Sequence, residues 1–167
     1  MKLEPIGIIH SPHRHPTGTP VQTAYAAGCT GTVEIFPPFV AGLKDLAGFE
    51  RIWLIYWFDR IGAPRLEVTP FLDTESHGIF ATRAPCRPNP IGFSPVRLLG
   101  IEGNILRVTD LDMLDGTPLL DLKPYVPAFD SFAAERIGWC HQIDLHGNAI
   151  ADQRFAIDQP PETGAGP

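Results

Sequence analysis

The chain has 167 residues, among them 18 prolines and 16 glycines, and it carries a net charge of −6. With 44% hydrophobic and 19% charged residues, it is typical of a folded globule with many turns and not of a disordered chain. The acidic balance argues against binding polyanions through overall charge, but it is compatible with a local basic patch.

No segment predicts secretion or a membrane span. The longest apolar run, "IWLIYWF" at 52–58, is too short to cross a bilayer, and the first residues lack the apolar region of a signal peptide. Cys29, Cys86 and Cys140 are widely spaced and show no metal-binding pattern, which favours reduced thiols. We therefore expect a cytoplasmic protein.

The first part of the chain predicts short strands around one helix. Residues 6–10 predict a strand, and residues 13–28 a long surface loop. The alternating "GTVEIF" at 31–36 predicts a half-buried strand. Apolar residues at helical spacing over 38–48 predict the one good helix. The run at 51–60 is apolar at both parities, which predicts a strand buried on both faces, or one lining a barrel and an interface.

The second part predicts further strands with tight turns. Residues 66–68 predict a weak strand and 79–81 a short one, and "GIEGN" joins two β-like runs within 94–114. Prolines pin an extended stretch at 117–129, and 140–157 repeats the hairpin pattern with "HGN" as its turn. Because no βαβ alternation, dinucleotide motif or P-loop occurs, these elements predict a mainly β barrel or sandwich.

Two polar motifs are open to more than one interpretation. His13 and His15 could ligate a metal, but no third ligand lies nearby in the sequence, so we favour solvated loop histidines and expect no metal. Asp59 and Arg60 end the most apolar strand, where an active-site rim often lies, although an ordinary surface ion pair is the simpler interpretation.

Four carboxylates lie close together in "TDLDMLDGTPLLDLKP". Asp110, Asp112, Asp115 and Asp121 predict either a structural turn at "DGT" or a site for a cation or an amino group. Their spacing differs from that of an EF-hand loop.

The stretch "ATRAPCRPNPIG" at 81–92 combines stiffness with positive charge. Each proline fixes its own φ and pushes the preceding residue toward extended backbone. Such a loop would hold Arg83 and Arg87 in fixed places, ready for a carboxylate, a phosphate or a carbonyl oxygen. We interpret the loop as functional, and its composition alone treats the two arginines alike.

The segments at 78–92, "GIFATRAPCRPNPIG", and 108–127, "VTDLDMLDGTPLLDLKPYVP", are similar to the TsaA-like family, whose best-known members are the TrmO tRNA methyltransferases. The segments at 6–12, 20–22 and 51–60 also match it, so the resemblance runs from about Pro5 to about Asp130.

The resemblance implies a small single-domain β-barrel, distinct from the Rossmann methyltransferases, with one or two short helices. We expect this domain to occupy residues 1–158, and we expect the tail at 159–167 to be disordered because the end of the chain has no apolar periodicity. The family binds S-adenosyl-L-methionine, usually as a homodimer with the site near the subunit interface. Carried over residue by residue, the expected cofactor-binding positions are Gln22, Asp59, Arg60, Arg83, Phe93, Ser94, Asp110, Leu111, Asp112, Leu114 and Asp115.

The chemistry of the cofactor agrees with these residues. Its carboxylate suits an arginine, and its adenine needs an apolar slot such as Phe80 and Phe93 would provide. The resemblance implies that Arg83 contacts the cofactor, whereas Arg87 either braces the loop or faces the acceptor. A nitrogen acceptor must also lose a proton; Asp115 or Asp121 could take it, or either could be structural.

TrmO enzymes methylate the exocyclic N6 of threonylcarbamoyl-adenosine beside the anticodon of certain tRNAs, which makes tRNA the expected substrate. Bacterial members carry a further C-terminal region that helps to grip tRNA, and no equivalent is seen after "RFAID". We therefore expect tRNA to meet a local basic surface, pooled across a dimer, of Arg60, Arg65, Arg83 and Arg87. The alternatives are a methyltransferase for a small-molecule acceptor and a non-catalytic cofactor-binding module.

Overall fold

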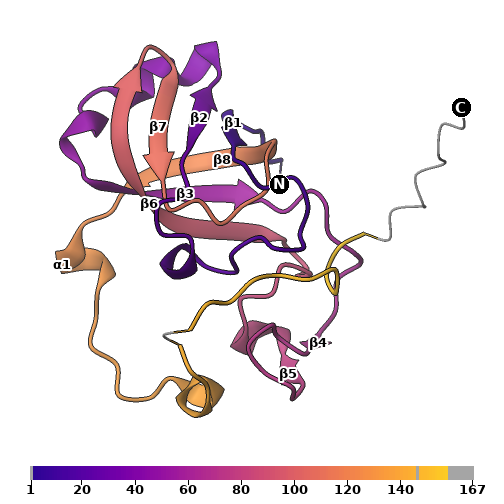
Figure 1. Ribbon diagram of the computed structural model, residues 1–167. Helices are drawn as coiled ribbons and strands as arrows, with labels where there is room; N and C mark the ends of the chain where they lie inside the picture. Colours follow the sequence, from indigo (N-terminus) through magenta and orange to yellow (C-terminus); the bar gives the residue numbers. More distant parts are fainter. Residues whose placement is uncertain (1, 146, 158–167) are drawn as a thin grey trace, which may run out of the picture.

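A closed barrel of six antiparallel strands forms the centre of the molecule in the computed structural model, which describes residues 2–145 and 147–157 (Figure 1). The strand order is β1-β2-β7-β6-β3-β8, and β8 pairs back onto β1 to close the barrel. The predicted mainly β barrel is confirmed. Its strands are β1 (Gly7–His10), β2 (Gly31–Ile35), β3 (Arg51–Trp57), β6 (Ile91–Glu102), β7 (Ile105–Thr109) and β8 (Thr117–Pro124).

Side-chain alternation explains why these segments form a barrel. Along β3, Ile52, Leu54 and Tyr56 are buried, whereas the residues between them are partly exposed on the outer face. Of the two alternatives for this apolar run, burial on both faces is wrong, since one face lies inside the barrel and the other is partly exposed. That the outer face forms an interface stays a prediction. The predicted hairpin is also confirmed, because β6 and β7 are joined by a turn at Gly103, whose φ is +62°.

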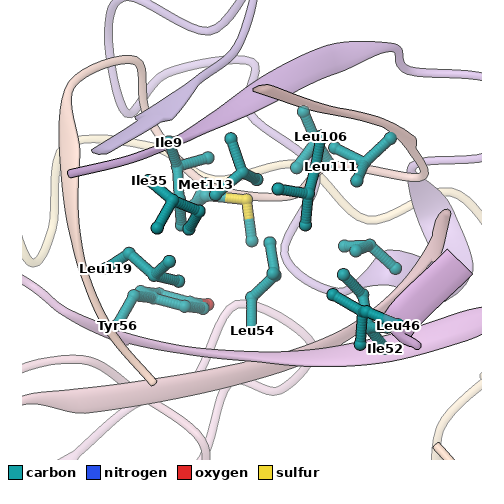
Figure 2. Packing of buried hydrophobic residues seen from close by; sticks show 13 residues of the cluster. Ile9, Ile35, Leu46, Ile52, Leu54, Tyr56, Leu106, Leu111, Met113 and Leu119 are labelled. Atoms are coloured by element: carbon teal, nitrogen blue, oxygen red, sulfur yellow. The ribbon is translucent and has the colours of Figure 1, made fainter. Parts of the chain in front are cut away.

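The barrel interior is filled by aliphatic side chains from all six strands and from the connections at its ends (Figure 2). Leu111 and Met113 follow β7 and pack into this core. Figure 2 shows Tyr56 and Leu119 on one side of the core and Leu46 with Ile52 on the other.

The connection between β3 and β6, residues 58–90, forms a small lobe beside the barrel (Figure 1). It contains the two-stranded sheet of β4 (Glu67–Val68) and β5 (His77–Gly78). Its own buried cluster is made of Val68, Ile79, Ala84, Cys86 and Phe155.

The predicted helix over 38–48 is wrong in type. The structure has two 3-10 helices there, Pro37–Leu43 and Leu46–Gly48, separated by Asp45 at a φ of +66°. A left-handed residue cannot continue an α-helix, so only short 3-10 turns form on either side. The strand predicted at 79–81 is likewise a 3-10 helix, Ile79–Ala81. The other helices described are the 3-10 helices Thr23–Tyr25 and Gly138–Gln142 and the four-residue α1 (Pro127–Asp130).

The hairpin predicted within 140–157 is also wrong. This stretch belongs to a C-terminal segment, defined here as residues 131–157, which returns across the molecule past the small lobe (Figure 1). It makes isolated antiparallel bridges, Ile150 with Pro20 and Ala156 with Ile61. The predicted "HGN" turn includes His146, which lies outside the described residues, as does the predicted tail at 159–167. Over the ranges described, no helix has the length and apolar character needed to cross a membrane.

Candidate functional site

A cavity of about 970 Å³ opens where the barrel, the small lobe and the C-terminal segment meet. Tyr56 and Asp112 line it from the barrel side, Phe71 from the small lobe and Trp139 from the C-terminal segment. Three parts of the chain that are distant in sequence therefore build one concave site, the usual form of a small-molecule pocket.

The structure brings most of the predicted cofactor residues to this cavity. Those that line it are Gln22, Asp59, Arg60, Arg83, Phe93, Asp112 and Leu114. Ser94, Asp110, Leu111 and Asp115 do not line it, although Ser94 and Asp110 support the loop that does.

Arg83 is held at the cavity by two partners. Its Nη1 donates a 2.6 Å hydrogen bond to Oε1 of Gln22, and its guanidinium lies 5.4 Å from the centre of the Phe93 ring. The side chain is otherwise exposed, and the stiff loop that carries it needs no further ordering to present it. Arg83 is thus a preorganised cation available to an anionic ligand.

Arg87 braces the same loop. Its Nη1 donates to the carbonyl oxygens of Ile79 and Thr82, at 3.1 and 2.9 Å, and its guanidinium lies 5.8 Å from the Phe80 ring. Of the two alternatives for this arginine, the structure therefore supports the bracing one.

Asp59 and Arg60 form a second polar group on the cavity wall. Arg60 Nε donates to Asp59 at 3.1 Å, and its Nη2 donates to the hydroxyl of Thr117 at 3.2 Å. The two residues form the ion pair that one sequence interpretation predicted. They also line the cavity, as the interpretation of an active-site rim predicted.

A left-handed turn aims the aspartate loop into the site. Asp110 has a φ of +71°, and its carboxylate accepts from Arg51 at 3.1 Å and from the amide of Gly28 at 3.2 Å. Beyond this turn Leu111 and Met113 are buried in the barrel core, while Asp112 between them lines the cavity. The two buried apolar neighbours fix the direction of the carboxylate.

Asp112 ends a chain of hydroxyl groups from the barrel. Ser94 Oγ donates to Asp112 Oδ1 at 2.8 Å and lies 3.1 Å from the hydroxyl of Tyr56, which must then donate to Ser94. Burial raises the pKa of Asp112 from 3.8 to about 6, although the hydrogen bond from Ser94, one from the Thr23 amide and the charge of Arg83 all oppose the rise. Burial also raises the pKa of Tyr56, which keeps its hydroxyl a donor.

The two aspartates considered as proton acceptors lie elsewhere. The Asp115 carboxylate is paired with Arg14 and lies 3.6 Å from His10, and Asp121 pairs with Lys123 at 2.8 Å. Neither lines the cavity.

Of the two predicted loop histidines, His13 makes polar contacts with side-chain and backbone groups. His13 contacts the Leu111 carbonyl and the Cys29 thiol, both at 3.1 Å. Across the ranges that the structure covers, no group of three His, Cys, Asp or Glu side chains could hold a metal ion.

Sequence reasoning missed the aromatic walls of the cavity. Tyr25, Phe71, Trp139 and Phe155 line it, and none of them stands in a motif that suggested a site. Trp139 is fixed by a 2.8 Å hydrogen bond from its Nε1 to the Ala81 carbonyl and by stacking on His77 at 4.6 Å. The sequence signal for Trp139 as a cavity residue was weak, because a single tryptophan outside any motif is most simply interpreted as a core residue.

Comparisons with known proteins identify the family. The model of the tRNA-methyltransferase O N-terminal domain matches residues 8–131. A probable S-adenosyl-L-methionine-binding protein of Pyrococcus abyssi is 58% identical over 152 residues, which are 90% of this chain and 83% of that protein. The tRNA (adenine(37)-N6)-methyltransferase of Escherichia coli is 33% identical over 140 residues, 78% of this chain and 60% of that enzyme.

A solved structure supports the same assignment. The crystal structure of TrmO from Pseudomonas aeruginosa aligns with a TM-score of 0.71 at 40% identity, covering 84% of this chain and 61% of that one. This chain thus spans about three fifths of the length of both bacterial proteins. The expected resemblance is confirmed, and the chain belongs to the tRNA-methyltransferase O family, the TsaA-like family to which its arginine–proline and aspartate motifs are similar.

Proposed function

We propose that this protein methylates the exocyclic N6 of an adenosine in tRNA, namely the threonylcarbamoyl-adenosine beside the anticodon, with S-adenosyl-L-methionine as donor. Membership of the family makes it an S-adenosyl-L-methionine-dependent methyltransferase. The observation that carries the proposal is the meeting of Arg83 with Asp112 in one cavity walled by aromatic rings.

The residues of the cavity fit the cofactor. The exposed Arg83 guanidinium suits its carboxylate, the carboxylates of Asp59 and Asp112 suit its positive groups, and Phe93 offers a ring face to its adenine. When bound, the cofactor supplies an electrophilic methyl group. The contribution of the chain is to position the reactants and to exclude water. We assign cofactor contacts to Gln22, Asp59, Arg60, Arg83, Phe93, Asp112 and Leu114.

The charge around the cavity supports a nucleic-acid acceptor. Arg60, Arg83 and Arg87 line it, and Arg65 lies beside it, bonded to the carbonyl of Arg154 at 3.4 Å. Exposed aromatic rings stand among these cations; Phe80 is 77% exposed. Sites for single-stranded nucleic acid typically combine guanidinium groups that follow the phosphate backbone with aromatic rings on which the bases stack. A tRNA substrate would place the protein in the cytoplasm.

The outer face of the barrel supports a homodimer. The Trp53 ring packs in tilted contacts against Phe93 and Tyr125, with ring centroids 5.4 and 5.6 Å apart, and Phe93 and Leu99 on the same strand, β6, are each about half exposed. A second copy is the occupant that the family resemblance favours, and Phe93 would carry the interface to the cavity rim. Leu99→Arg should convert the dimer to a monomer in analytical ultracentrifugation. A wild-type protein that sediments as a monomer at high concentration would overturn the dimer.

Labelled methyl donor and two tRNA pools test the proposed function. One pool comes from cells with the threonylcarbamoyl modification and one from cells without it. Label in the modified tRNA alone supports the proposal. Label in both pools would move the acceptor to unmodified adenosine, and cofactor binding without transfer to either pool would favour a small-molecule acceptor or a binding module. Absence of any calorimetric heat or melting shift at millimolar S-adenosyl-L-methionine would overturn the proposal outright.

A further inference from the structure

The cavity contains three carboxylates, and their partners separate them. Asp59 is paired with Arg60 at 3.1 Å. Asp152 receives three hydrogen bonds of 2.8 to 3.0 Å from the Arg154 side chain, which together with the Arg154 amide lowers its pKa. The paired guanidinium stabilises the ionised form of Asp152, which makes this carboxylate a weak base, and the carboxylate of Asp59 is engaged in its ion pair.

Asp112 has a different environment. The contacts described for its carboxylate are neutral donors, the hydroxyl of Ser94 and the amide of Thr23. The charged or titratable groups that face it are Arg83 across the cavity, Tyr56 behind Ser94, and the Cys29 thiol, whose pKa Asp112 helps to raise. A half-buried carboxylate held only by neutral donors is a stronger base than one held by a guanidinium, as Asp152 is.

We propose that Asp112 is the general base that takes the proton from the acceptor nitrogen during methyl transfer. This inference rests on the proposed function and gives Asp112 a role beyond contact with the cofactor. The nitrogen lone pair forms the new bond to the methyl carbon while the carbon–sulfur bond breaks, its electron pair leaves with sulfur as a neutral thioether, and the N–H proton passes to the Asp112 carboxylate. Solvent takes that proton after product leaves.

Ser94 and Tyr56 act as positioning residues. Ser94 holds Oδ1 of Asp112 by the 2.8 Å bond and, together with the Thr23 amide, fixes the carboxylate at the cavity wall. The bond from Ser94 also lowers the pKa of Asp112, so its loss should make the base stronger but poorly ionised at neutral pH.

The test measures single-turnover methyl transfer to modified tRNA at saturating S-adenosyl-L-methionine. For the wild-type protein the single-turnover rate should rise tenfold per pH unit at low pH and then level off. The bend should lie at or below about pH 6, because Arg83 and the bound cationic donor favour the ionised form of Asp112. Asp112→Asn should lower the rate at pH 7.5 by about 100-fold or more and abolish the bend. Its Kd for the cofactor should rise, because a contact to a positive group is lost, but by less than the loss in rate, and the rate is measured at saturating cofactor. Asp152→Asn is the matched control and should keep the wild-type pH profile.

Two readouts do not depend on turnover. Carboxyl ¹³C resonances of the free protein should show one aspartate titrating near pH 6, absent from Asp112→Asn. In Ser94→Ala that titration, and the bend in the rate profile, should both move to higher pH. These spectra also verify that the variants are folded.

The outcomes separate the inference from the proposed function. Transfer by the wild-type protein with an unchanged rate and bend in Asp112→Asn would overturn the inference alone. A cofactor Kd raised about 30-fold in Asp112→Asn, with the single-turnover rate preserved, would also overturn it and leave Asp112 as a cofactor contact. Wild-type protein that binds the cofactor but methylates no tRNA would overturn the proposed function, and the general base with it.

Discussion

Arg83 Nη1 donates to Oε1 of Gln22 at 2.6 Å, although 61 residues separate the two in the chain. This bond joins the loop that precedes the first 3-10 helix to the proline-rich loop of the small lobe. It fixes the guanidinium above Phe93 without neutralising its charge. A neutral partner is what a ligand-binding cation needs, since an acidic partner would compete with the ligand.

Replacing Arg83 by alanine should therefore weaken S-adenosyl-L-methionine binding. The loss should be about 2 kcal/mol, or about 30-fold in Kd, because one charged hydrogen bond to the ligand disappears. Calorimetric titration measures it. Arg107→Ala, which removes an exposed arginine paired with Glu102, should leave the Kd unchanged. Equal affinity in Arg83→Ala and wild type would show that Arg83 does not contact the cofactor.

Arg87, four residues away, should behave in the opposite manner. It donates to two backbone carbonyls of the small lobe, so Arg87→Ala leaves both oxygens without that donor. We expect a loss of about 2 kcal/mol in the free energy of unfolding, measured by urea titration. The cofactor Kd of the folded variant should change less than that of Arg83→Ala. An unfolding midpoint equal to that of wild type would contradict the bracing role.

The barrel strands could be predicted from sequence because short apolar runs, some of them alternating, are bounded by turn residues. In β3 every second residue enters the core, and in the β6–β7 hairpin a glycine with positive φ marks the turn. The C-terminal segment has no such signal. Its bridges at Ile150 and Ala156 are single contacts, and what fixes its course is the docking of Trp139 on His77 and the Ala81 carbonyl.

The site could be predicted only in part, because the sequence carries no local signal for the direction of each side chain. The motif "LDMLDG" gives aspartates of equal appearance, and the sequence does not say which one faces a ligand. The backbone decides it: the left-handed Asp110 sets the register by which Leu111 and Met113 enter the core and Asp112 does not. Asp115, three residues further along the loop, instead accepts a hydrogen bond from the Ser11 amide and pairs with Arg14.

Gly92 offers a test of the support beneath Asp112. It pairs with Tyr56 across β3 and β6, and a Cβ built at Gly92 would collide with the Tyr56 ring. Gly92→Ala should therefore displace Tyr56, weaken its bond to Ser94 and lower the free energy of unfolding by about 1–3 kcal/mol. Gly42→Ala is the control, since a Cβ there meets nothing within 4 Å. Chemical denaturation compares the two, and equal stabilities would mean that the ring moves aside at little cost.

The pKa of Asp112 predicts how stability depends on pH. Because burial raises this pKa from 3.8 to about 6, the folded protein binds more protons than the unfolded chain between these values, and Asp112 makes stability fall as pH rises through that window. Above pH 6 the ionised carboxylate costs roughly 3 kcal/mol relative to pH below 4. Asp112→Asn keeps an acceptor for Ser94 but cannot ionise, so it removes this cost.

The difference in unfolding free energy between Asp112→Asn and wild type should therefore increase in favour of the variant from pH 4 to pH 7, and then stay constant. Urea titrations at a series of pH values measure it, and a melting series gives the same sign. Asp152→Asn should show a trend of the opposite sign, because the Arg154 side chain lowers the pKa of that carboxyl in the folded protein. A difference that is flat across the whole range would mean that Asp112 titrates as an ordinary aspartate. In that case the cavity does not desolvate it, and its environment does not make it the base that the methyl transfer needs.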